Sequence, residues 1–248
     1  MRGLSEADSA ADPGAEAPGL LSRLLDNTPL DRRGRAALLR RLAVALAGSA
    51  KRAGAAAVAS GQWLTDTVAQ LAPHVPVRDL PTLSAHHGGL VGDALAAALI
   101  DNASRATGAI GAAAGVVSSL EFAAPPLLLT SPVQVAAETV AVIAVELKLV
   151  AELHEVYGRP AAGTSAMKAA AYLGAWTRRK ALDRAGGDGV SGALTGAAGR
   201  ALRRRVIRRA GSSATSVLPL LTGAVASASL NSRQTKRLGE QIAKELRG

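Results

Sequence analysis

The segment from Ser131 to Gly158 constrains the fold of this chain most strongly, because it combines a helix start, an apolar interior and a helix stop. Ser131-Pro132 is a favourable pair for the N-cap and first turn of a helix. Gly158 suits the position that directly follows many helices. A helix between these signals has about 26 residues and a length of roughly 39 Å. The segment therefore predicts one long helix that other elements must surround.

The composition favours helices throughout the chain. Small and aliphatic residues are abundant, whereas the chain has two Trp, two Tyr and one Phe. Alanine is the strongest helix former, and no alternation of apolar and polar residues is long enough to predict a strand. Pro125-Pro126 must break the apolar segment that precedes the long helix, because proline lacks an amide hydrogen and clashes with the preceding turn. The sequence therefore predicts an all-α fold, a multi-helix bundle with a long central helix and a proline-broken apolar helical hairpin.

Composition also divides the chain into three regions. Residues 1–19 are small, polar and acidic, and we interpret them as a disordered acidic tail. Residues 20–82 predict an N-terminal helical region with a basic block, whose first helix covers about 20–26. Residues 83–248 predict a second helical domain, and its last helix covers about 232–247. Three glycines are expected as possible helix breaks in the N-terminal region: Gly48, Gly54 and Gly61.

Two weakly polar stretches are candidates for a membrane-spanning helix. Such a helix requires about 20 consecutive apolar residues. Residues 210–232 carry no charge, but they contain many serines and threonines and a central Pro219. We therefore favour packing of helix against helix, and residues 106–130 remain the best candidate for a hairpin that enters the bilayer. The first residues lack the apolar core of a secretory signal, and cysteine is absent. We expect a cytoplasmic location.

The net charge of +10 is concentrated in two basic blocks, residues 32–52 and residues 178–209. Such blocks suit a polyanionic partner, either the head groups of anionic lipids or a nucleic acid. The alternative is that they are solvated helix faces without a partner. Scarce aromatic residues weigh against single-stranded nucleic acid, which usually stacks its bases on aromatic rings. An anionic membrane surface or a membrane protein complex is therefore the partner that we expect first.

The second basic block contains a predicted amphipathic helix over residues 193–209. Its arginines follow a spacing of four residues, which places several of them on one stripe. A basic amphipathic helix of this kind can lie on an anionic membrane with its apolar side inward, contact phosphates of nucleic acid, or pack on the bundle with its arginines in water. The candidate residues for anion or membrane contact are Arg200, Arg204, Arg205, Arg208 and Arg209.

A pair of carboxylates is the strongest catalytic candidate in the sequence. Glu121 precedes the proline break and Glu138 follows it, so the two side chains would approach each other if their helices packed as a hairpin. Two neighbouring carboxyl groups with shifted pKa values are a candidate general acid/base site. The alternative is that each acid in this region lies at the surface or pairs with a neighbouring arginine. We lean towards a protein that is not an enzyme.

Other chemical motifs are missing or misplaced. His154 lies between Glu152 and Glu155, but this spacing matches neither di-iron bundles nor zinc proteases. His86-His87 precedes two glycines, and we interpret both histidines as exposed loop residues. The glycine clusters match no phosphate-binding loop, and no serine lies in a Gly-x-Ser-x-Gly motif. We therefore expect no metal and no cofactor.

The order of segments resembles the EcsC family of bacterial proteins. One part of the resemblance is the small-residue stretch GAIGAAAG at 108–115, the proline-broken apolar segment, and the long helix that ends in LHEVYG at 153–158. The other part is VLPLLTGAVASASLNSRQTKRLGEQIAKEL at 217–246, which is similar to the apolar proline–glycine segment and charged final helix of that family. The positions that match the family pattern are Tyr157, Gly158, Pro219, Gly223 and Asn231.

The resemblance covers roughly residues 85–247 and implies a helical protein, without catalytic residues that transfer to this chain. The family takes its name from a protein encoded beside the subunits of an ABC-type transporter, which implies association with a membrane system. The matching residues have structural interpretations: Gly158 as a helix stop, Pro219 with Gly223 as a bend, and Asn231 as a cap of the final helix or a hydrogen-bonding residue within the bundle. The function that we expect is a non-enzymatic accessory protein on the membrane or on a membrane transport complex.

Overall fold

The computed structural model describes residues 16–26, 31–122, 131–185 and 220–248. All of the regular secondary structure in these ranges is helical, which confirms the predicted all-α fold. A short 3-10 turn at Ala72–His74 joins two of the α-helices. The α-helices are α1 (Ala17–Leu25), α2 (Arg32–Ala53), α3 (Ala55–Ser60), α4 (Gln62–Leu71), α5 (Leu80–His86), α6 (Gly92–Phe122), α7 (Ser131–Val156), α8 (Ser165–Ala185) and α10 (Leu220–Arg247).

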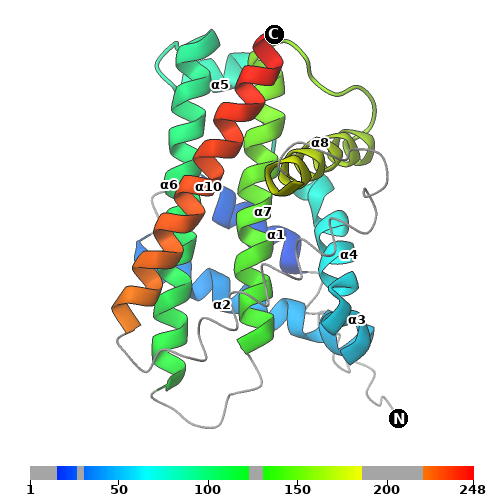
Figure 1. The fold of residues 1–248 in the computed structure, drawn as a ribbon, viewed down its shortest axis with the longest axis vertical. Coiled ribbons are helices and arrows are strands. Elements are labelled where there is room, and N and C mark those ends of the chain that lie inside the picture. Colours follow the sequence, from blue (N-terminus) through cyan, green and yellow to red (C-terminus); the bar gives the residue numbers. More distant parts are fainter. Residues whose placement is uncertain (1–15, 27–30, 123–130, 186–219) are drawn as a thin grey trace, which may run out of the picture.

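Three long helices, α6, α7 and α10, run along the long axis of the molecule (Figure 1). α6 is antiparallel to α7 and α10, so the start of α6 and the C-terminus of the chain lie at the same end. α2 crosses behind these helices and packs against both α6 and α7, while α1 packs on α2 and α7. α8 lies across the side of α7, near the 3-10 turn that follows α4.

α7 is the central helix of the bundle. Every residue from 136 to 153 is buried, so α7 contacts other elements on all of its sides within this range. Its start at Ser131 agrees with the predicted start, and it ends at Val156, followed by Gly158 with a φ of 66°. A helix that is largely apolar on all sides is stable in water only when other helices surround it.

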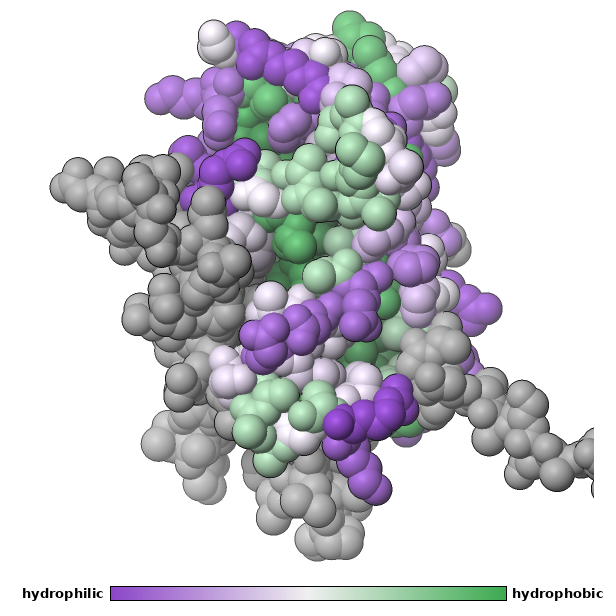
Figure 2. All heavy atoms as spheres, turned by 90° about the vertical axis from the view of Figure 1, so that its right-hand side faces the viewer, coloured by the Kyte–Doolittle hydropathy of each residue, from purple (hydrophilic) through white to green (hydrophobic). Residues whose placement is uncertain are grey.

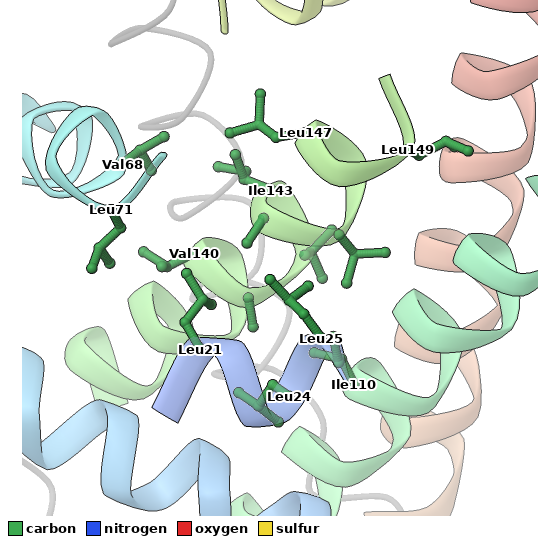
Figure 3. Close-up of a cluster of buried hydrophobic side chains, with 14 of the residues drawn as sticks. Leu21, Leu24, Leu25, Val68, Leu71, Ile110, Val140, Ile143, Leu147 and Leu149 are labelled. Carbon is green, nitrogen blue, oxygen red and sulfur yellow. The ribbon is translucent and has the colours of Figure 1, made fainter. Parts of the chain in front are cut away.

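The core connects the N-terminal helices to α7. In Figure 3, Leu21 and Leu25 of α1 and apolar residues of α4 point towards one side of α7. The apolar residues on that side of α7 are Val140, Ile143 and Leu147. Ile110 of α6 approaches from another side and is 1% exposed. The two helical regions expected at 20–82 and 83–248 therefore share one hydrophobic core.

Several predicted boundaries need correction. The first helix begins at Ala17, inside the stretch interpreted as a disordered tail, and Ala17 itself is buried. Gly54 and Gly61 separate helices and have φ values of 86° and 81°, whereas Gly48 lies inside α2. The final helix begins at Leu220 instead of about 232, so α10 is twelve residues longer than predicted. Pro125-Pro126 lies outside the described residues.

α6 and α10 pack very closely at Gly111. A Cβ atom on Gly111 would lie 2.9 Å from the side chains of Asn231 and Ser227 and 3.0 Å from the backbone nitrogen of Ala228. A hydrogen in place of a side chain is therefore required for this approach. The GAIGAAAG stretch thus brings two helices of the bundle together, which is the packing that we favoured for it.

No helix within the described ranges has the length and apolar character that crossing a bilayer requires.

Candidate functional site

The outer face of α2 is a strongly basic surface. α2 carries seven basic residues and no acidic residue, and six of the seven are exposed. At 100° per residue, Arg33, Arg40 and Lys51 lie within about 20° of one another around the helix axis. Arg41 and Arg52 form a second row, roughly 100° to 120° from Arg40.

An exposed valine lies between the two basic rows. Val44 is 63% exposed and is displaced by about 40° from Arg40 around the axis. Arg41 makes an exposed ion pair with Glu16, with 3.4 Å between the charged atoms. The face over α8, α4 and α3 is different, because hydrophilic residues there form separate bands among apolar ones (Figure 2). The outer face of α2 therefore combines a cationic surface with a single apolar contact.

A pocket of about 100 Å³ opens between α1, α2, α5, α6 and α7. Half of its lining residues are apolar, mostly leucine and alanine, and its charged lining residues come from four segments of the chain. Pockets that combine apolar walls with a few convergent charges are the usual form of a small-molecule site. The charged lining residues are Asp26, Arg35, Arg78, Lys148 and Glu152.

Lys148 and Glu152 form a buried ion pair at the wall of this pocket. Their spacing of four residues places them on one face of α7, and the Lys148 ammonium donates a hydrogen bond to the Glu152 carboxylate. The two residues are 8% and 4% exposed. Burial lowers the pKa of Lys148, and the nearby Glu152 carboxylate opposes that shift. The positive charge of Lys148 and the negative charge of Glu152 thus neutralise each other.

Arg35 and Arg78 also line the pocket, and both are half-buried. Their guanidinium groups form no hydrogen bond or ion pair with any residue that the structure describes. Partly desolvated cations without a partner are unfavourable, so they favour an anion in the pocket. The sequence does not mark these four residues as members of one pocket. The one local signal is the spacing of four residues between Lys148 and Glu152 in a largely apolar helix.

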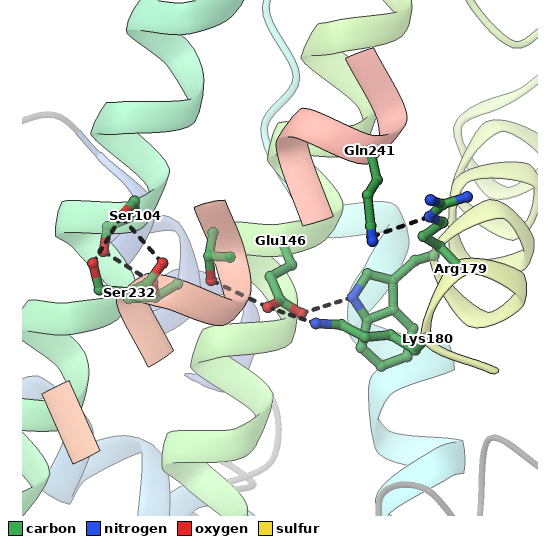
Figure 4. A network of polar contacts seen from close by, with 9 residues as sticks. Ser104, Glu146, Arg179, Lys180, Ser232 and Gln241 are labelled. Atoms are coloured by element: carbon green, nitrogen blue, oxygen red, sulfur yellow. Dashed lines mark hydrogen bonds and ion pairs between the residues drawn. The ribbon is translucent and has the colours of Figure 1, made fainter. Parts of the chain in front are cut away.

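Glu146 forms a second buried polar centre, which joins three helices (Figure 4). Its carboxylate accepts hydrogen bonds from Trp176 Nε1 at 2.8 Å, Lys180 Nζ at 3.1 Å and Thr235 Oγ1 at 3.1 Å. Glu146 is 0% exposed. These donors come from α8 and α10, so the carboxylate fastens both helices to α7.

Glu138, the second member of the predicted carboxylate pair, belongs to a third buried group. Its Oε1 accepts hydrogen bonds from Ser227 Oγ and Asn231 Nδ2, both at 3.2 Å, and Asn231 also donates to the Thr107 carbonyl. The side chain of Glu121 lies outside the described residues. Position 121 lies fourteen residues beyond Thr107 in α6, about 21 Å along the helix, which does not favour a shared site.

One part of the alternative, a position at the surface, is wrong for three of these acids. Glu138, Glu146 and Glu152 are buried, and the ion pairs of Glu146 and Glu152 with other described residues use lysines. The reason is that α7 is covered on all sides, so an acid on it must find a partner inside the bundle. These carboxylates are engaged by protein groups and serve to fix helices relative to one another.

The family-pattern positions have structural roles where the structure describes them. Tyr157 donates a hydrogen bond to Asp93 at 2.7 Å and accepts one from Arg247 at 3.2 Å, and burial raises its pKa. Asn231 is 1% exposed and lies inside α10, so it is not a helix cap. Its hydrogen bonds within the bundle confirm the other interpretation. Gly223 lies in α10, and Pro219 lies outside the described residues.

The histidines have local partners. His154 is half-buried, its Nδ1 lies 2.7 Å from the Val150 carbonyl, and its ring packs edge-on against Tyr172. His87 is also half-buried and hydrogen-bonds to Asn102, so the expectation of an exposed residue is wrong for His87. His86 is exposed as expected, but it is the last residue of α5 and not a loop residue. The described ranges contain no group of three His, Cys, Asp or Glu residues arranged to hold a metal ion.

The arginines predicted to contact anions in the second basic block lie outside the described residues. They are Arg200, Arg204, Arg205, Arg208 and Arg209.

No family model matches the chain, and no curated protein or solved structure matches it either.

Proposed function

We propose that this chain is a non-enzymatic accessory protein that binds the anionic surface of a membrane peripherally, on the cytoplasmic side and in association with a membrane transport complex. The outer face of α2 is the observation that carries this proposal. The resemblance to the EcsC family agrees with it, and membership of that family is part of the proposal. The arginines at 200–209 would strengthen the electrostatic attraction to the anionic membrane.

The geometry of α2 supports contact with a lipid surface. The row formed by Arg33, Arg40 and Lys51 extends over eighteen residues, or roughly 27 Å of helix. Each basic residue close to an anionic bilayer contributes about 1 kcal/mol of attraction. Val44 between the two rows offers an apolar contact at the interface. A helix with this arrangement suits the plane of the head groups, whereas scarce aromatic residues disfavour single-stranded nucleic acid.

Vesicle flotation tests the proposal directly. The full chain is mixed with vesicles of phosphatidylcholine alone or with added phosphatidylglycerol, at low and high salt. We expect flotation with the anionic vesicles at low salt only, because salt screens the attraction. The triple variant Arg33→Gln, Arg40→Gln, Lys51→Gln should bind on the order of 100-fold more weakly.

A matched variant controls for net charge. Arg233, Arg237 and Lys244 are exposed residues of α10, and changing all three to glutamine removes the same charge from another surface. This variant should keep most of the binding. Equal loss in both triple variants, or no flotation of the unchanged protein with anionic vesicles, would contradict the proposal.

A further inference from the structure

The pocket between α1, α2, α5, α6 and α7 has an unbalanced distribution of charge. Lys148 and Glu152 neutralise each other within hydrogen-bonding distance. Arg35 and Arg78 remain, both are half-buried, and their guanidinium groups form no hydrogen bond or ion pair with any described residue. Asp26, the other acid of the lining, lies at the exposed end of α1. The five charged lining residues thus carry a net charge of +1, and two of the three cations are arginines.

Three further polar residues line the pocket, His86, His87 and Asn102, and the remaining lining is apolar. Leu24 and Leu25 at the end of α1, Leu83 of α5 and Leu99 of α6 are all buried and line it. They provide a surface that an aliphatic chain fills favourably, since each buried methylene group adds to the affinity. A guanidinium presents its donors in a planar fork that matches carboxylate and phosphate oxygens. The lining therefore offers an anionic subsite beside an apolar one.

We propose that this pocket binds a small water-soluble organic anion, a carboxylate or phosphate monoester that carries a short aliphatic chain. The anionic group lies between Arg35 and Arg78, and the chain lies against the leucines. Size limits the ligand, because an engineered apolar cavity of about 150 Å³ accommodates benzene and this pocket is about 100 Å³. A chain of a few carbon atoms fits, whereas a nucleotide is too large to be enclosed. The proposal does not depend on the contact of α2 with lipid.

Calorimetric titration of the full chain with simple probes tests the two subsites separately. We expect pentanoate and pentyl phosphate to bind saturably, with dissociation constants of about 1 mM or lower. Acetate and inorganic phosphate, which lack the chain, should bind at least about tenfold more weakly. Pentan-1-ol and pentylammonium, which lack the negative charge, should show no saturable binding.

Variants then assign the anionic subsite. Arg35→Gln and Arg78→Gln should each weaken the binding of pentanoate by about tenfold, because each removes a charged hydrogen-bond donor. Arg23→Gln, at an exposed position of α1 that does not line the pocket, should leave it unchanged. Circular dichroism checks that the variants are folded. Absence of saturable binding, equal affinity for acetate and pentanoate, or equal effects of Arg23→Gln and Arg35→Gln would overturn the proposal.

Discussion

Glu146 and Lys180 form an ion pair between α7 and α8, with 3.1 Å between the carboxylate oxygen and the ammonium nitrogen, and both residues are buried. Thr235 of α10 donates to the same carboxylate oxygen, and Trp176 donates to the other one. Lys180 also lies 6.0 Å from the centroid of the Trp176 ring. One carboxylate thus links three helices, and its loss affects the packing of all of them.

Removal of one partner of this pair is expected to destabilise the protein strongly. Lys180→Met removes the ammonium group that pairs with the buried Glu146 carboxylate, which should lower the free energy of unfolding by about 3 to 5 kcal/mol. Denaturant titration followed by circular dichroism measures the change. The double variant Lys180→Met, Glu146→Leu should be more stable than Lys180→Met, because it removes the buried carboxylate together with its partner.

An exposed ion pair serves as the control. Lys236 and Asp101 also lie 3.1 Å apart, but their side chains are 51% and 52% exposed. Lys236→Met should therefore change the free energy of unfolding by less than about 1 kcal/mol. If Lys180→Met and Lys236→Met lowered the free energy of unfolding by similar amounts, burial of the Glu146 ion pair would not determine how much that pair contributes to stability.

Glycine at position 111 is expected to be essential for the contact between α6 and α10. Gly111→Ala places a methyl group within 3.0 Å of the Ala228 backbone, so the helices must separate. We expect a loss of about 1 to 3 kcal/mol, although alanine has the higher helix propensity. Gly48→Ala in α2 meets only the flexible Arg52 side chain at 3.6 Å and should be neutral or stabilising. Thermal unfolding compares the two variants, and an equal shift in both would contradict this prediction.

Local signals in the sequence were sufficient for α7 but not for α10. Ser131-Pro132 and Gly158 act within one turn of the chain, so the ends of α7 could be predicted from neighbouring residues alone. The first half of α10 contains serine, threonine and asparagine, which have weak helix propensity. Ser227 and Asn231 gain hydrogen bonds to Glu138 when α10 packs on α7, and no local pattern reveals that partner.

The polar centres and the pocket could be predicted only in part. Charged residues inside an apolar helix are visible in the sequence, but Glu146 finds Lys180 and Thr235 at separations of 34 and 89 residues. Such partners depend on the order in which helices pack, which helical periodicity does not specify. Arg35 and Arg78 appear as ordinary members of basic or loop segments, and only the folded chain brings them to one cavity.

Gly158 is expected to contribute to stability through its backbone conformation. Its φ of 66° is left-handed, and no atom lies within 4 Å of the position that a Cβ would occupy. Gly158→Ala should therefore lower the free energy of unfolding by about 1 kcal/mol through backbone strain alone. Gly158→Asn should cost less, because asparagine tolerates this conformation better. Denaturant titration distinguishes them, and a larger loss for asparagine would contradict this explanation.

The ammonium group of Lys148 is expected to make the free energy of unfolding vary with pH in the alkaline range. Burial lowers its pKa below 10.5 in the folded protein, although Glu152 opposes the shift. Between the lowered pKa and 10.5 the unfolded chain binds more protons than the folded chain, so this residue's contribution to stability rises with pH in that window.

Two variants isolate the Lys148 contribution, because Tyr157 and Tyr172 have raised pKa values and also titrate at alkaline pH. Neither Lys148→Met nor Lys148→Arg titrates at position 148 in this range. For each variant, we take the difference between the free energy of unfolding of the unchanged protein and that of the variant. This difference should increase as pH rises towards 10.5 and then level off. Chemical denaturation at a series of pH values measures both differences. A difference that falls with pH, or that rises for one variant only, would show that the buried ammonium is not the titrating group.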